Sequence, residues 1–212
     1  MKIFKEIADE VLKGNSDSVE VLTNKALSQD ISAEDILNNG LVAGMDIVSE
    51  KFKNNEIFIP EVLISAKSMY SGLGILKPLL AESNVKSKGK VVIGTVKGDL
   101  HDIGKNIVAM LLQGAGFDVV DLGADVPKEK FLEFVKKEQA DILGMSALLT
   151  TTMIFMKDII EMLKNAGLRE NVKVIIGGAP VTESYATQIG ADGYAPDAAS
   201  GVDLAKKLLG KT

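Results

Sequence analysis

The 212-residue chain contains no cysteine and only one histidine, His101. Without thiols it has no disulfide framework, no thiolate metal site and no cysteine nucleophile. Any metal chemistry must therefore use other ligands. The chain also lacks an apolar signal core near residue 1 and any apolar run of membrane-spanning length, so we expect a soluble, cytoplasmic protein without a membrane partner.

A concentrated basic region is missing as well. Residues 1–88 carry 10 basic and 13 acidic side chains, and residues 89–212 carry 14 and 16. A phosphate-binding surface needs clustered lysine and arginine, so nucleic acid is not an expected partner. Hydrophobic residues make up 46% of the chain, which is enough for the packed core of one large domain or two small ones.

Apolar residues in the first 83 positions recur at helical spacing. Segments 2–13 and 17–28 show this pattern, and a capping sequence at 32–35 opens a third helix that runs to about Phe52. Pro60 marks the first turn of a fourth helix, because proline is tolerated there. We therefore predict a four-helix bundle over residues 1–83, which acts as a cap domain.

We interpret the polar stretch at 84–89 as a linker. The spacing of apolar residues changes after it. Short apolar runs alternate with helical segments, and a last helix covers about 198–209. The runs that predict strands are 91–95, 119–122, 142–145, 172–176 and 192–195. This alternation predicts a parallel sheet with helices on both faces. The predicted fold is therefore α+β with two domains, the four-helix cap and a flavodoxin- or Rossmann-like α/β domain of five parallel strands at 90–212.

Loops at the carboxyl ends of parallel strands are where such sheets bind ligands. After the first strand, Asp99 lies two residues before His101, and Gly104 lets the next helix begin close to a ligand. Residues 146–152 after the third strand offer hydroxyl groups. Residues 177–178 after the fourth strand are both glycine, which removes side-chain bulk. Together these loops predict a long, flat or tailed ligand at the sheet edge.

Each of these residues also has a simpler interpretation. His101 alone could be a hydrogen-bonded loop residue, and Asp102 is best interpreted as a helix N-cap. The glycines at 177–178 could form a tight turn, and the threonines at 150–152 could cap a helix. Lys105 is expected to be solvated. The combination of the three loops decides between the interpretations.

The combined spacing resembles a known signature. Asp99-x-His101-x-x-Gly104 is followed after 41 residues by Ser146-x-Leu148 and after 28 more by two glycines, as in cobalamin-binding domains that hold the cofactor with its dimethylbenzimidazole base detached. With its helical half, the whole chain resembles the corrinoid proteins of methyltransferase systems, of the methylamine or quaternary-amine type, and the cobalamin-binding module of methionine synthase. The resemblance implies cobalamin or a related corrinoid as cofactor.

It also implies roles for individual residues. His101 resembles the imidazole that replaces the lower ligand of cobalt, and Asp99 resembles its carboxylate partner. Thr152 stands where related methionine synthases carry a serine that completes a triad, so these three residues are the expected catalytic set. The residues implied in cofactor binding are Gly98, Asp99, Leu100, His101, Asp102, Gly104, Ser146, Leu148, Thr150, Gly177, Gly178 and Ala198, together with Phe52 and Ile59 over the upper corrin face.

The function implied by the resemblance is that of a methyl carrier. It would accept a methyl group on Co(I) from a substrate-specific methyltransferase and pass it, as methyl-Co(III), to a second methyltransferase with tetrahydrofolate or a thiol as acceptor. A reductive activation protein is a further implied partner. The carrier itself would have no complete active site. His101 would bind and release the metal, and the helical domain would shield the reactive face and move aside at the linker.

Two other classes of function remain open. The small cobalamin-binding subunit of an adenosylcobalamin-dependent mutase shares the histidine loop but typically lacks the helical half. A cobalamin-dependent sensor ordinarily adds a DNA-binding module, and a receiver-like domain carries an acceptor aspartate at the end of a strand within an acidic cluster. The helical half and the position of His101 favour the carrier.

Overall fold

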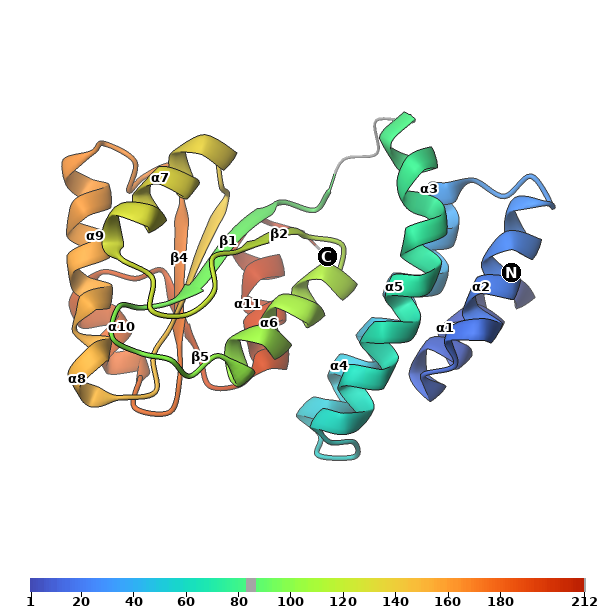
Figure 1. Ribbon diagram of the computed structural model, residues 1–212, viewed down its shortest axis with the longest axis horizontal. Coiled ribbons are helices and arrows are strands. Elements are labelled where there is room, and N and C mark those ends of the chain that lie inside the picture. Colours follow the sequence, from blue (N-terminus) through green and yellow to red (C-terminus); the bar gives the residue numbers. More distant parts are fainter. Residues whose placement is uncertain (83–86, 212) are drawn as a thin grey trace. The chain divides into compact units, whose positions relative to one another are not determined.

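The structure, a computed structural model, describes residues 1–82 and 87–211 (Figure 1). The chain divides into two compact units, one comprising Met1–Ser87 with Gln113–Gly116 and the other Lys88–Leu112 with Phe117–Thr212. Residues 84–86 of the predicted linker at 84–89 lie outside the described residues. Within the described ranges, no helix is both long enough and apolar enough to cross a membrane. The cytoplasmic location stays a prediction.

The first unit is helical, as predicted. Its elements are α1 (Lys2–Lys13), α2 (Ser16–Leu27), α3 (Ala33–Ile36), the π-helical segment η1 (Leu37–Val42), α4 (Ala43–Lys53) and α5 (Ile59–Glu82). The hydroxyl oxygen of Ser32 accepts a hydrogen bond from the backbone N–H of Asp35 at 3.0 Å, so the predicted cap is present. The third predicted helix contains the π-helical turn, which periodicity did not indicate.

Glycines allow the π-helical segment and the start of α4 to approach α1 closely. A Cβ atom at Gly40 would lie 3.1 Å from Cγ2 of Ile7, and one at Gly44 would lie 2.8 Å from Cβ of Val11. Ile7 and Val11 are fully buried, together with Met69 of α5. These contacts form the core of the bundle.

The second unit is an α/β domain with the predicted strands. Its elements are β1 (Lys90–Thr95), α6 (Ile103–Gly114), β2 (Asp118–Asp121), α7 (Lys128–Glu138), β3 (Ile142–Ser146), α8 (Thr150–Met153), α9 (Phe155–Asn165), β4 (Lys173–Gly177), α10 (Glu183–Ile189), β5 (Gly193–Ala195) and α11 (Ala198–Leu208). All strand pairs in the sheet are parallel, in the order β2-β1-β3-β4-β5. The prediction of a five-stranded parallel sheet is confirmed.

Helices cover both faces of this sheet. Figure 1 shows α7, α9 and α10 on one face and α6 and α11 on the other. On the first face, Phe131 of α7 and Ile160 of α9 belong to one buried cluster with Val92 and Leu143 of the strands. The strands β1, β3 and β4 are buried along almost their whole length, which explains why they appear in the sequence as continuous apolar runs.

The register of the parallel strands aligns the carboxyl-terminal residues of β1, β3, β4 and β5 at one edge of the sheet. Thr95 of β1 pairs with Ser146 of β3, Ser146 with Gly177 of β4, and Gly177 with Ala195 of β5. The strand order reverses between β1 and β3, where sheets of this kind bind ligands. The loops after β1 and β3 therefore emerge side by side at the expected place for a site.

Candidate functional site

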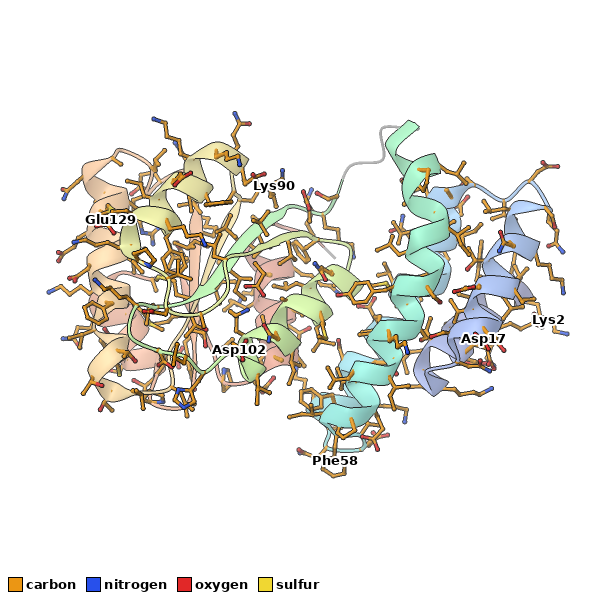
Figure 2. All side chains as sticks on the ribbon, in the orientation of Figure 1. Lys2, Asp17, Phe58, Lys90, Asp102 and Glu129 are labelled. Atoms are coloured by element: carbon orange, nitrogen blue, oxygen red, sulfur yellow. The ribbon has the colours of Figure 1, made fainter. Side chains whose placement is uncertain are left out.

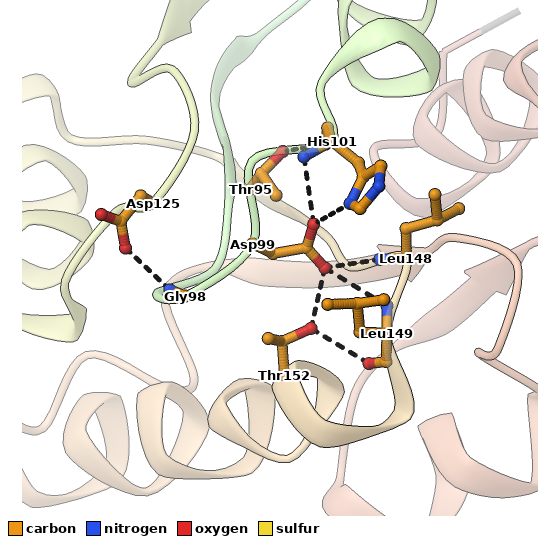
Figure 3. Close-up of polar contacts among 8 residues, drawn as sticks. All are labelled: Thr95, Gly98, Asp99, His101, Asp125, Leu148, Leu149 and Thr152. Atoms are coloured by element: carbon orange, nitrogen blue, oxygen red, sulfur yellow. Dashed lines mark hydrogen bonds and ion pairs between the residues drawn. The ribbon is translucent and has the colours of Figure 1, made fainter.

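Asp99 lies at the centre of a hydrogen-bond network between these two loops (Figure 3). Its side chain is fully buried. Oδ1 accepts from the backbone N–H of His101 at 3.1 Å and lies 2.7 Å from the ring nitrogen Nδ1 of the same residue. Oδ2 accepts from the backbone N–H groups of Leu148 at 2.7 Å and Leu149 at 3.3 Å. Asp99 thus joins the loop after β1 to the loop after β3.

The contacts of Asp99 fix its charge state. Burial by itself would raise the pKa of this carboxyl group, but hydrogen bonds from the Leu148 N–H, the Thr152 hydroxyl and His101 outweigh that effect and hold the pKa well below its ordinary value. Asp99 is therefore a carboxylate at neutral pH and can only accept hydrogen bonds. The Nδ1 atom of His101 must donate to it, which leaves Nε2 as the ring nitrogen that can bind a metal.

Thr152 completes the network from α8. Its side chain is buried, and Oγ1 lies 2.7 Å from Oδ2 of Asp99 and 3.0 Å from the carbonyl oxygen of Leu149. The hydroxyl has one proton, and a hydrogen bond to a carboxylate is stronger than one to a neutral carbonyl. Thr152 therefore donates to Asp99. The structure brings together the three residues of the predicted triad.

The backbone of the His101 loop is held on both sides of Asp99. Gly98, with φ of 79°, donates its N–H to Oδ1 of Asp125 at 2.7 Å, and Asp125 donates its own N–H to the carbonyl oxygen of Asp99 at 2.9 Å. The buried hydroxyl of Thr95 donates to the carbonyl oxygen of His101 at 3.0 Å. The positive φ explains the glycine at 98. The loop is therefore built to hold His101 in one orientation.

The imidazole itself faces solvent among apolar side chains. The His101 side chain is 51% exposed, although its Asp99 partner is buried. Five large apolar residues of the same two loops and the helices that follow them are also exposed, namely Leu100, Ile103, Leu148, Leu149 and Ile154. Clustered exposed apolar groups mark a binding surface. A single free imidazole nitrogen on such a surface suits the axial position of a metal held by a large, mostly apolar macrocycle.

Comparison with known proteins identifies that macrocycle. A family described as "B12 binding domain" matches residues 89–203, and a second family with the same description matches residues 3–77. A corrinoid protein of Desulfitobacterium hafniense is 44% identical over 100% of this chain and 99% of its own length. Dimethylamine corrinoid protein 1 of Methanosarcina acetivorans is 46% identical over 98% of both chains. The chain belongs to the corrinoid proteins of methyltransferase systems.

The fold of a solved structure supports the same family assignment. A chain of the methanol:cobalamin methyltransferase complex of Methanosarcina barkeri matches with a TM-score of 0.90 and 34% identity, covering 100% of this chain and 81% of that one. The expected corrinoid cofactor and the methyl-carrier function are therefore confirmed. Because both halves of the chain match, the mutase alternative is not favoured.

Two other residues that are expected to bind the cofactor, Asp102 and Gly104, come directly after the His101 region of the chain. Asp102 precedes α6, and its carboxylate accepts a hydrogen bond from the side-chain amide of Asn106 at 3.1 Å (Figure 2). Gly104 is exposed, and a Cβ atom added there would meet nothing within 4 Å. The first turn of α6 therefore leaves open space beside the His101 loop.

The residues expected to line the nucleotide tail lie along the same sheet edge. Ser146 and Gly177 are the last residues of β3 and β4, and Ala198 is the first residue of α11, which follows β5. Thr150 is exposed at the start of α8. Their contact with the cofactor stays a prediction.

Gly178 has a structural reason to be glycine. Its φ is 122°, and a Cβ atom there would lie 1.9 Å from the carbonyl oxygen of Ala147. The loop after β4 passes so close to the loop after β3 that only glycine fits. The tight-turn interpretation of this residue therefore accounts for it without a ligand.

Phe52 and Ile59 belong to the helical unit. Phe52 is half-buried near the end of α4, and Ile59 is exposed at the start of α5. The neighbouring Phe58, labelled in Figure 2, is 62% exposed. Their expected place over the corrin stays a prediction.

Lys105 contradicts the expectation of a solvated side chain. The residue is only 3% exposed, and its Nζ atom lies 2.5 Å from Oδ2 of Asp121 and 2.6 Å from Oδ1 of Asn106. A signal was present in the sequence, because Lys105 lies on the helical stripe of Ala109 and Leu112, which are both buried. A lysine on an apolar stripe indicated a buried charge, but the stripe did not identify its partner Asp121.

Proposed function

We propose that this corrinoid protein carries methyl groups with His101 as the lower axial ligand of cobalt, bound through Nε2. The observation that supports this is the buried Asp99 carboxylate, which holds Nδ1 of an exposed histidine at 2.7 Å. The bound corrinoid supplies the cobalt centre that accepts and releases the methyl group. The protein holds and orients the cofactor and excludes water from it.

The hydrogen-bond network sets the properties of the imidazole. A carboxylate that accepts from the second ring nitrogen of a metal-bound histidine orients the ring and raises its basicity. Asp99 performs this role because Leu148 and Thr152 hold its other oxygen at 2.7 Å each. His101 has one fixed partner and one free nitrogen, which lets it bind the metal and release it without rearranging the loop.

The exposed apolar residues and the sheet edge serve the rest of the cofactor. Leu148 and Leu149 place apolar side chains beside His101 while their backbone groups hold Asp99. A corrin ring over these side chains would remove them from water. The edge formed by Ser146, Gly177 and Ala198 would take the detached nucleotide tail.

We assign a methylated amine as the methyl donor. Support comes from the dimethylamine corrinoid protein of Methanosarcina acetivorans, which matches this chain along nearly its whole length at 46% identity. Methanol is the second candidate, because the chain of the methanol:cobalamin methyltransferase complex has a closely similar fold. The first partner is a methyltransferase specific for the donor. The further partners are a second methyltransferase with tetrahydrofolate or a thiol as acceptor and a reductive activation protein.

Reconstitution tests this function. The protein would be loaded with hydroxocobalamin, reduced, and mixed with dimethylamine, trimethylamine or methanol and the methyltransferase for each donor. The visible spectrum of the cofactor reports methyl transfer. We expect bound corrinoid and transfer from an amine, and a weaker response after His101→Ala. Transfer only from methanol would contradict the donor assignment, and failure to bind any corrinoid would contradict the function.

A further inference from the structure

Lys105 has the least exposed basic side chain among the ion pairs recorded in the α/β unit. Its side chain is 1% exposed, whereas the side chain of its partner Asp121 is 35% exposed. The pair joins the first turn of α6 to the end of β2. The amide of Asn106 extends the network, because it accepts from Lys105 and donates to Asp102.

The position of Lys105 in the chain is informative. His101, Ile103 and Gly104 are exposed and Asp102 is half-buried, so Lys105 is the first buried residue after His101. Between His101 and Lys105, no residue has a buried apolar side chain that could hold the backbone in place. The carboxyl-terminal end of the His101 loop is therefore anchored by an ion pair.

The partner of Lys105 is itself connected to the His101 loop. Asp121 accepts the N–H of Gly123 at 2.9 Å through Oδ1. The carbonyl oxygen of Gly123 accepts the N–H of Thr95 at 2.9 Å, and the Thr95 hydroxyl donates to the carbonyl oxygen of His101. A continuous series of contacts thus runs from Lys105 through β2 and β1 back to the backbone of His101.

We propose that Lys105 is a positioning residue for His101. By pairing with Asp121, it sets the backbone direction at the end of the loop and so directs the imidazole toward the metal. Asp99 fixes the ring from the β3 side, and Lys105 fixes the backbone from the β2 side. This inference rests on the proposed role of His101 as cobalt ligand.

The burial of the pair decides which variants are informative. Removing one partner of a buried pair leaves the other charge without compensation, which is strongly destabilising. Asp121 is about one-third exposed and can be hydrated when Lys105 is lost, so Lys105→Met is the milder change. Asp121→Asn interrupts the same contact from the other side.

Lys90 provides a matched control. It also forms ion pairs within the α/β unit, with Asp118 at 3.3 Å and Glu138 at 3.2 Å. It lies at the amino end of β1, whereas the His101 loop follows the carboxyl end. Lys90→Met therefore removes ion pairs of a lysine in the same unit, one that is 32% exposed, without touching the contacts that lead to His101.

The experiment measures coordination rather than methyl transfer. Each variant is labelled with nitrogen-15 histidine, saturated with hydroxocobalamin and reduced to the cobalt(II) state. Electron paramagnetic resonance then gives the ratio of cobalt whose lines are split in two by the histidine nitrogen to cobalt whose lines are unsplit or are split in three by the nitrogen of the cofactor's own base. We expect Lys105→Met and Asp121→Asn to lower this ratio about tenfold, as changes to outer partners of a metal ligand typically do, and Lys90→Met to leave it unchanged.

The outcomes separate the two proposals. If the wild-type protein shows no histidine nitrogen on cobalt, the role of His101 fails and this inference fails with it. If the wild type shows it and the Lys105 and Asp121 variants match Lys90→Met, only the positioning role is wrong, even when thermal unfolding shows that they are less stable. Should one of the two variants not fold, the other provides the same comparison with Lys90→Met.

Discussion

The segments that follow β1 and β4 each contain a glycine, Gly104 in the first turn of α6 and Gly178 directly after β4, and the two glycines have different surroundings. At Gly178 the φ of 122° and the carbonyl oxygen of Ala147 leave no room for a side chain. At Gly104 the space is open, and Ile103 before it is also exposed. Glycine thus marks close backbone packing after β4 and open space in the first turn of α6.

The largest effect on folding is expected from Gly178→Ala. The new methyl group would meet the Ala147 carbonyl oxygen, and alanine is strained at this φ. We expect a loss of about 3 kcal/mol in the free energy of unfolding. Urea denaturation of the apoprotein measures it. Unchanged stability would mean that the loop after β4 is not packed as described.

Asp99→Asn is expected to weaken metal coordination by about 10- to 100-fold. An amide presents an N–H₂ group either to His101 or to the Leu148 and Thr152 donors, so one side of the network loses its acceptor and His101 is held less firmly. Titration with hydroxocobalamin, followed by the visible spectrum, measures the affinity. Asp125→Asn is the control, because the amide oxygen can still accept from the Gly98 N–H. Equal affinities for the two variants would count against the network.

Gly104→Ala is expected to separate binding from folding. Because the added methyl group meets no protein atom, stability should stay the same or rise slightly, whereas cobalamin affinity should fall about tenfold through contact with the ligand. Gly74→Ala in α5 is the control, since its Cβ also meets nothing within 4 Å. Thermal unfolding and cobalamin titration of both variants test this. Unaltered affinity for Gly104→Ala would place the ligand elsewhere.

Thr152 variants should give the smallest effects. Thr152→Ser keeps the hydroxyl that donates to Asp99 and should bind cobalamin as the wild type does. Thr152→Val removes that hydrogen bond and should lower the free energy of unfolding by about 1 kcal/mol. Chemical denaturation and cobalamin titration compare the two. A valine variant as stable as the wild type would contradict the role of the hydrogen bond, and a serine variant as impaired as the valine variant would show that the site also requires the threonine methyl group.

The sequence was sufficient to predict the sheet and the centre of the site. Strands β1, β3 and β4 are buried almost throughout, so their apolar runs could be recognised in the sequence. The sequence places Asp99 two residues before His101, and the resemblance identified it as the partner of the imidazole. The contact between Thr152 and Asp99 crosses 53 residues and followed only from a resemblance. No local pattern encodes such a distance.

Other features were missed for physical reasons. Lys105 was expected in solvent because lysine is rarely buried, and its partner Asp121 lies 16 residues away. The π-helical turn at 37–42 changes the backbone hydrogen bonds but keeps the apolar face on the bundle, so periodicity does not detect it. In both cases, contacts between distant elements decide the local structure.

The most direct test of the central claim is the spectrum of cobalt(II) in protein labelled with nitrogen-15 histidine. His101 is the only histidine, so the label reports on one residue. If Nε2 of His101 binds the metal, labelling will change the splitting of each cobalt line from three components to two. Three components in both samples would mean that another nitrogen is the ligand, and the absence of splitting would mean that cobalt has no nitrogen ligand on that face.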